Sequence, residues 1–226
     1  CTTGSPADWN QEWRGPIRHA YNYLSKHASR VFEHEVLKIS KTDPTLLRNE
    51  YISVLLEGTF DHQEEFLKKH LKPSDNYEER ALQLLSLLEM QKFTMFAYTS
   101  CGWFFGEVSG LEPVQNMKYA RRAIELMSYF ETGFSNDKFL SFLSEAKSNI
   151  DTRSGMQIYN DYTSSHLPTT YRVVAEILYR QLHTNTQYCS NLGIFNITVT
   201  PLSHNTINID SVDIINTSTR ESEKLI

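Results

Sequence analysis

Apolar residues recur at helical spacing through most of this 226-residue chain. Between about Pro16 and Leu182 they return every three or four positions, and clusters of Gly, Pro and Asp divide the pattern into segments. No segment within these bounds alternates in the way that is typical of a strand. A chain with this pattern buries its apolar side chains by packing helices against one another, so we expect this part to be all helical.

Several helices have recognisable starts in the sequence. Asp43 and Asp61 are placed to cap two of them, Asn136 follows Gly133 in the same way, and Pro113 suits a first helical turn because its missing N–H would have no partner there. The apolar spacing predicts helices over roughly residues 16–40, 44–57, 61–71, 77–100, 113–131, 137–149, 154–166 and 169–183.

The segment 77–100 is apolar around most of its circumference rather than along one stripe, so we expect it to be the central helix. Glu89 lies within it and must find a partner, such as an arginine, or stay protonated; we expect a structural role for it. The apolar face of 113–131 predicts a helix that covers the core from outside. The residues that make 77–100 apolar are Leu82, Leu84, Leu85, Leu87, Leu88, Phe93, Met95 and Phe96.

The composition changes after His183. The segments 194–200, 207–210 and 212–214 alternate and are rich in β-branched residues, which predicts strands, and the end from Ser218 is interpreted as frayed or as a linker. The predicted fold class is therefore mainly α: a multi-helix bundle with a short antiparallel β segment at the C-terminus. We expect a helical domain over 1–184 and a β segment over 185–226, which either packs on the helices or opens a β-domain.

Charge and cysteine content exclude several classes of function. The net charge is −5 and the Lys and Arg residues are scattered, so we expect no nucleic-acid partner, and no apolar stretch is long enough to predict a membrane partner. Cys1, Cys101 and Cys189 form neither a disulfide framework nor a zinc motif, which favours a reducing, cytoplasmic compartment over secretion. Since the chain begins with Cys rather than Met, we interpret it as a piece of a longer protein.

Motifs for cofactors and metals are also lacking. No histidine has a glutamate three residues before it, so a di-iron site is not predicted, and neither a phosphate-binding loop nor a nucleophile elbow is present. The Glu33-His34-Glu35 triplet is interpreted as a solvated helix face. We therefore expect no cofactor and no metal.

Glycoside hydrolysis needs two carboxylates that converge on one bond, a geometry that the sequence alone does not show. The glutamates that could supply them are Glu50, Glu57, Glu89, Glu107 and Glu112.

Two aromatic clusters allow both a structural and a functional interpretation. The segment Trp9–Pro16 holds two tryptophans, which either pack as a lid on the bundle or form an exposed platform for a flat ligand such as a sugar ring. In the segment 99–107, TSCGWFFGE, Gly102 ends the central helix in the left-handed conformation in the structural interpretation. In the other, Trp103 is a stacking face and Glu107 binds hydroxyl groups, a pairing suited to a carbohydrate.

The same residues resemble a known family. The runs Leu88–Lys92, Tyr98–Gln115 and Tyr119–Ile124, with Trp9–Pro16 and Arg48–Ile52 in support, are similar to the uncharacterised domain that follows the catalytic barrel in bacterial proteins of glycoside hydrolase family 57. The resemblance spans nearly the whole chain, and TSCGWFF is its most specific part.

The resemblance implies that a distorted (β/α) barrel upstream supplies both catalytic carboxylates and that this chain carries no catalytic residue. It implies an accessory domain of an enzyme acting on α-glycans, with the barrel and a carbohydrate as partners. Substrate-binding residues that would complete the sugar cleft are then Trp103, Glu107, Tyr98 and Phe104. The alternative is a purely structural or oligomerisation module without a ligand.

Overall fold

The structure, a computed structural model, describes residues 6, 8–130, 133–164, 171, 174–175, 191–192, 195–201 and 209–225. The chain divides into two compact units, Cys1–Ser164 and Ser165–Ile226. The expected boundary between 184 and 185 lies outside the described residues. Most of the predicted helix 169–183 does so too, although residues 171, 174 and 175 are helical.

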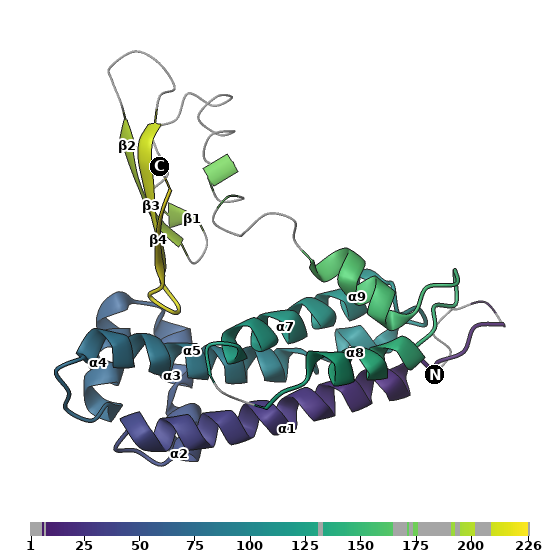
Figure 1. Cartoon of the computed structure of the whole chain (residues 1–226), viewed down its shortest axis with the longest axis horizontal. Coiled ribbons are helices and arrows are strands. Elements are labelled where there is room, and N and C mark those ends of the chain that lie inside the picture. Colours follow the sequence, from purple (N-terminus) through teal and green to yellow (C-terminus); the bar gives the residue numbers. More distant parts are fainter. Residues whose placement is uncertain are drawn as a thin grey trace. The chain divides into compact units, whose positions relative to one another are not determined.

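The first unit is built from helices, and the predicted mainly α fold is confirmed (Figure 1). The predicted helix 44–57 is two helices, because the helix is interrupted at Tyr51. The short helix Cys101–Phe104 was not predicted. The helices are α1 (Arg14–Ile39), α2 (Pro44–Glu50), α3 (Ile52–Glu57), α4 (Phe60–His70), α5 (Tyr77–Phe96), α6 (Cys101–Phe104), α7 (Leu111–Met127), α8 (Asn136–Glu145) and α9 (Gly155–Thr163).

Helix α5 lies at the centre of this unit, as predicted. It packs against α1 and α7, while α1 also packs against α8. Side chains all around α5 are buried from Leu84 to Gln91, so this part of the helix is enclosed. The enclosure ends before the last turn, where Met95 is 54% and Phe96 is 40% exposed. Helix α7 covers the core as expected, with its apolar face turned inward.

The helix starts follow the capping rules, with two shifts from the predicted residues. Asp43 caps α2, and its Oδ1 accepts from the N–H groups of Thr45 and Leu46 at 2.9 and 3.1 Å. Thr59 caps α4 in place of Asp61, and Ser135 caps α8 in place of Asn136. Both predictions were wrong because each helix begins a residue or two earlier than expected. Asp61 instead lies in the first turn of α4, where its carboxylate interacts favourably with the positive end of the helix dipole.

The predicted role of Gly102 was wrong. Helix α5 ends at Phe96, its cap Ala97 keeps a right-handed conformation, and Gly102 lies inside α6. The glycines with positive φ in the described part of the chain are Gly58 and Gly133. A Cβ added at Gly102 would lie 2.1 Å from Nδ2 of Asn116, so this glycine is needed for the close approach of α6 to α7.

The second unit contains an antiparallel sheet in the order β1-β2-β3-β4. Its strands are β1 (Asn191–Leu192), β2 (Phe195–Pro201), β3 (Ile209–Asn216) and β4 (Ser222–Leu225). The predicted strands are confirmed where they are described, and 209–214 belongs to one strand rather than two.

Residues Ser222–Leu225 form strand β4, so the interpretation of the end from Ser218 as frayed or as a linker was wrong. The turn between β3 and β4 is set by Asn216, whose Oδ1 accepts from the N–H groups of Ser218 and Thr219. Arg220 then takes a positive φ of 63°. These local hydrogen bonds return the chain onto β3, where Glu223 pairs with Ile214.

Candidate functional site

The four predicted site residues lie where α5 ends, in α6 and in the loop to α7, next to the N-terminal half of α1. Trp103 packs on Trp13, with ring centroids 6.4 Å apart and planes at 9°. Tyr21 meets Trp103 edge-on, at 5.9 Å and 84°. Trp13 and Tyr21 are buried, whereas Trp103 is partly exposed. The indole of Trp103 therefore lies at the edge of the core.

An arginine that the sequence analysis did not identify lies against these rings. The guanidinium carbon of Arg18 is 4.5 Å from the Trp103 ring centroid and 5.3 Å from that of Tyr98. Tyr98 also donates from its hydroxyl to Oδ1 of Asn22 at 2.9 Å. We call Trp13, Arg18, Tyr21, Tyr98 and Trp103 the aromatic corner. Nothing in the sequence signals that Arg18 and Trp103 meet, because they are far apart along the chain.

The protonation states in the aromatic corner are well defined. Burial raises the pKa of Tyr98, and the neighbouring Arg18 opposes this rise. Burial also raises the pKa of Tyr21, with smaller contributions from Tyr159 and Tyr98. Both hydroxyl groups are therefore protonated at neutral pH.

Phe104 and Phe105 follow Trp103 and turn outward. Their side chains are 60% and 43% exposed, and the rings meet at 85° with centroids 5.2 Å apart. The backbone is tied to α1, because Nη2 of Arg14 donates to the carbonyls of Phe104 and Phe105 at 3.0 and 3.1 Å. Nε1 of Trp13 donates to the carbonyl of Gly106 at 3.2 Å. The chain thus fixes two exposed aromatic rings on an ordered backbone.

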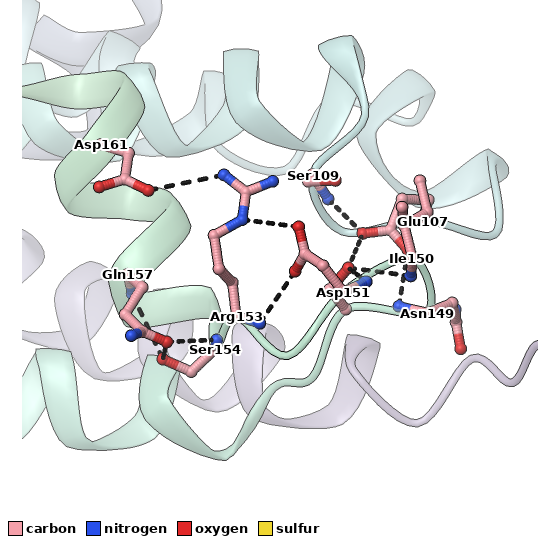
Figure 2. A network of polar contacts seen from close by, with 10 residues as sticks. Glu107, Ser109, Asn149, Ile150, Asp151, Arg153, Ser154, Gln157 and Asp161 are labelled. Atoms are coloured by element: carbon pink, nitrogen blue, oxygen red, sulfur yellow. Dashed lines mark hydrogen bonds and ion pairs between the residues drawn. The ribbon is translucent and has the colours of Figure 1, made fainter.

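Glu107 points into the protein and is 6% exposed (Figure 2). Its Oε1 accepts from the Ser109 N–H at 2.9 Å and from the Ser148 hydroxyl at 2.8 Å, and its Oε2 accepts from the Asn149 N–H at 2.7 Å. Three protein donors therefore satisfy this carboxylate. Asn149 extends the connection, since its Nδ2 donates to the carbonyls of Gly106 and Asn10.

The segment 148–154, which supplies two of the donors to Glu107, is held by further polar contacts (Figure 2). Nε of Arg153 lies 2.8 Å from Oδ2 of Asp151, and Nη1 of Arg153 lies 3.5 Å from Oδ2 of Asp161 in α9. Ser154 and Gln157 form a capping box at the start of α9. The network joins the α6–α7 loop to α9 through the segment 148–154.

The two N-terminal tryptophans, for which a packed lid and an exposed platform were both considered, differ in their burial. Trp13 is buried and packs as a lid, whereas Trp9 is partly exposed. Residues 9–12 are not helical, so Trp9 and Trp13 do not share a helix face. For Trp13 the packing interpretation is confirmed.

Two further acidic residues considered in the sequence, Glu89 and Glu35, have structural partners. Glu89 is 2% exposed, accepts from the Tyr51 hydroxyl at 2.8 Å and pairs with Lys92, rather than with an arginine. Glu35 is nearly buried and contacts His34 and Lys38, both through its Oε1, so the Glu33–Glu35 triplet is only partly a solvated face. In the described ranges, His, Cys, Asp and Glu side chains form no group of three suited to a metal ion.

Comparisons with known proteins give a family but no function. No curated protein and no solved structure matches this chain. Among the described residues, no helix has both the length and the apolar character needed to cross a bilayer. At the family level, residues 9–226 match a domain of unknown function (DUF3536). Since the match covers nearly the whole sequence, the chain belongs to the family described as domain of unknown function DUF3536.

Proposed function

We propose that this chain is a non-catalytic accessory domain of a cytoplasmic, glycoside hydrolase family 57-like protein that acts on α-glycans. In this proposal the domain completes the sugar-binding cleft of a catalytic barrel that precedes it. The proposal is supported by the resemblance of the TSCGWFF region to the domain that follows such barrels. It is also supported by the surface that this region forms.

The observation that carries the proposal is the pair of exposed rings on a fixed backbone. Phe104 is 60% exposed although it is large and apolar, and its carbonyl is held by Arg14. Sugar rings pack their apolar faces on aromatic side chains, and their hydroxyl groups bind nearby polar groups. Arg18, exposed beside Trp103, supplies such a group.

The four predicted residues take different roles in this proposal. Phe104 contacts the sugar directly, and Tyr98 and Trp103 hold the Arg18 guanidinium in place through cation–π contacts. Because Trp13 and Arg18 already lie against the Trp103 ring, this indole offers little free face for stacking. Glu107 positions the loop that follows Phe104, since its carboxylate is occupied by protein donors.

A second candidate is a structural or oligomerisation module without a ligand. It is favoured by the burial of Glu107 and by the packing of Trp103 on three side chains. In that case the aromatic corner only joins α1 to the α5–α7 region. The two candidates differ in what the exposed Phe104 ring does.

The test is Phe104→Ala in the protein that carries the catalytic barrel. We expect kcat/KM for an α-glucan to fall about tenfold or more, which corresponds to about 1.4 kcal/mol, with an unchanged melting temperature. The control is Phe60→Ala, because Phe60 is 58% exposed on α4. Equal kcat/KM in the two variants would favour the structural module, and hydrolysis by this chain alone would refute the non-catalytic role.

A further inference from the structure

Two guanidinium groups lie close to the aromatic segment Trp103–Phe105. Nη2 of Arg14 donates to the carbonyls of Phe104 and Phe105 at 3.0 and 3.1 Å. The guanidinium carbon of Arg18 is 4.5 Å from the ring centroid of Trp103. Arg14 and Arg18 are one turn apart on α1, about 6 Å along the helix axis, so they lie on the same side of it. The exposed aromatic surface therefore has two positive charges beside it.

Neither guanidinium is paired with a carboxylate among the described residues. Arg14 binds neutral acceptors, which are the two carbonyls and Oε1 of Gln11. Arg18 forms no hydrogen bond and no ion pair with any residue that the structure describes. The carboxylate of Glu107 is 6% exposed and already accepts from three protein donors. The N–H donors of Arg18 are therefore available to a ligand.

Helix α1 adds no negative charge near these two arginines. No Asp or Glu occurs between Glu12 and Glu33, although the whole chain has a net charge of −5. Asn22 contributes amide N–H groups, because its Oδ1 already accepts from the Tyr98 hydroxyl at 2.9 Å. This face of α1 thus offers donors and positive charge, which suit a ligand with acceptors and negative charge. The exposed side chains of α1 between residues 14 and 32 are Arg18, His19, Asn22, Lys26 and Arg30.

A guanidinium in this setting favours an anion over a sugar hydroxyl group. A carboxylate or a phosphate accepts two parallel hydrogen bonds from a guanidinium, and such charged bonds are stronger than the bonds to a neutral hydroxyl group. The contacts of Arg18 with the Trp103 and Tyr98 rings hold the guanidinium in place without using its N–H donors.

We propose that the glycan bound at this surface is acidic. It carries a carboxylate or a phosphate group, which accepts paired hydrogen bonds from Arg18 while a sugar ring packs on Phe104. Arg14 adds to the attraction through its charge and keeps its contacts with the backbone. This inference rests on the proposed function, because it needs Phe104 to contact a sugar, and it adds the substrate class: acidic α-glycans in preference to neutral α-glucans.

The test is isothermal titration calorimetry of the intact chain with three α-linked trisaccharides. Maltotriose is neutral, a maltotriose monophosphate carries a phosphate group, and trigalacturonic acid carries carboxylates. We expect an acidic trisaccharide to bind about tenfold or more tightly than maltotriose, and the tighter of the two acidic ligands identifies the preferred group. Added salt should weaken the binding of that ligand and leave the binding of maltotriose nearly unchanged, because salt screens the attraction between charges.

Two variants locate the preference at Arg18. Arg18→Gln is expected to lower the affinity for the acidic ligand to that for maltotriose, at an unchanged melting temperature. Arg30→Gln is the matched control, because it removes the same charge from an exposed position about 18 Å further along α1. This control should keep the preference for the acidic ligand.

Three results would overturn the inference: equal or weaker binding of both acidic trisaccharides than of maltotriose, a preference that persists in Arg18→Gln, or binding of inorganic phosphate as tight as that of the acidic ligand. Failure of the proposed function is distinguished by Phe104→Ala, since every trisaccharide would then bind this variant and the native chain alike. Binding of maltotriose that depends on Phe104, without a preference for the acidic ligands, would overturn this inference alone.

Discussion

Single residues decide how closely the helices approach, and Gly102 shows this most clearly. A Cβ at this position would lie 2.1 Å from Nδ2 of Asn116, whose amide is fixed by Thr99 through hydrogen bonds of 2.6 and 3.0 Å. We expect Gly102→Ala to lower the free energy of unfolding by about 1–3 kcal/mol, because overpacking forces neighbours to shift. Urea denaturation measures this change.

Gly15→Ala is the matched control for that substitution. Gly15 also lies in a helix, but nothing lies within 4 Å of an added Cβ. Alanine has a higher helix propensity than glycine, so the free energy of unfolding of Gly15→Ala should be unchanged or rise by about 0.5 kcal/mol. If both alanine variants behave alike, the close approach of α6 to α7 is not the reason for the glycine.

Glu107 is expected to be important for stability. Its carboxylate accepts three hydrogen bonds while 6% exposed, and bonds to a charged acceptor are stronger than neutral ones. Glu107→Gln should lower the free energy of unfolding by about 1.5–3 kcal/mol, as measured by urea denaturation. The exposed Glu65 on α4 provides the control Glu65→Gln, and similar stability of the two variants would contradict the structural role.

At the residue scale, the sequence reveals only what depends on near neighbours. Asp43 could be predicted as a cap because its partners are two and three residues away. The sequence could not reveal that Ser148 and Asn149 bind Glu107, since they lie about forty residues further along the chain. The same limit explains why Arg18 was missed.

At the scale of elements, periodicity predicted most helices because a buried stripe constrains every third or fourth residue. Helix α5 was recognised as central from its all-round apolar character, and its burial from Leu84 to Gln91 confirms this. Helix α6 was missed because its four residues are too short to show a period. Strand β4 was missed because Ser222–Leu225 has no β-branched residue and depends on β3 for pairing.

The junction of α4 with the end of α1 is expected to be sensitive to pH. His70 is 1% exposed; its Nδ1 is 2.8 Å from Oγ1 of Thr42, and its Nε2 is 3.1 Å from Oε2 of Glu50. Burial lowers the pKa of His70 below its usual 6.5; Lys69 and Lys41 act in the same direction, and Glu50 opposes them.

The sign of the pH dependence follows from this lowered pKa. The unfolded chain takes up a proton at His70 near pH 6.5, before the folded chain does, so stability is full above this pH and falls as the pH drops further. Urea denaturation at several pH values should show this loss, and His70→Gln should reduce it. His62→Gln, on the same helix, is the control; the same pH profile in His70→Gln and the native chain would contradict the assignment.

At the scale of the whole molecule, the change in composition after His183 predicted a boundary between 184 and 185, whereas the chain divides into two compact units after Ser164. The buried apolar cluster of the first unit runs from Trp13 to Tyr159, so all of its residues belong to that unit. We therefore expect a chain that ends at Ser164 to fold cooperatively, with the helical content of this unit. Circular dichroism during thermal unfolding measures this, and a broad, non-cooperative transition would contradict it.

The function of the whole molecule depends on whether the exposed aromatic surface binds a sugar. Isothermal titration calorimetry of the intact chain with an α-glucan oligosaccharide tests this most directly. We predict that the native chain and Phe60→Ala bind alike, while Phe104→Ala binds about tenfold more weakly or not at all, at an unchanged melting temperature. No binding by the native chain, or equal binding by all three proteins, would contradict the proposed sugar-binding surface.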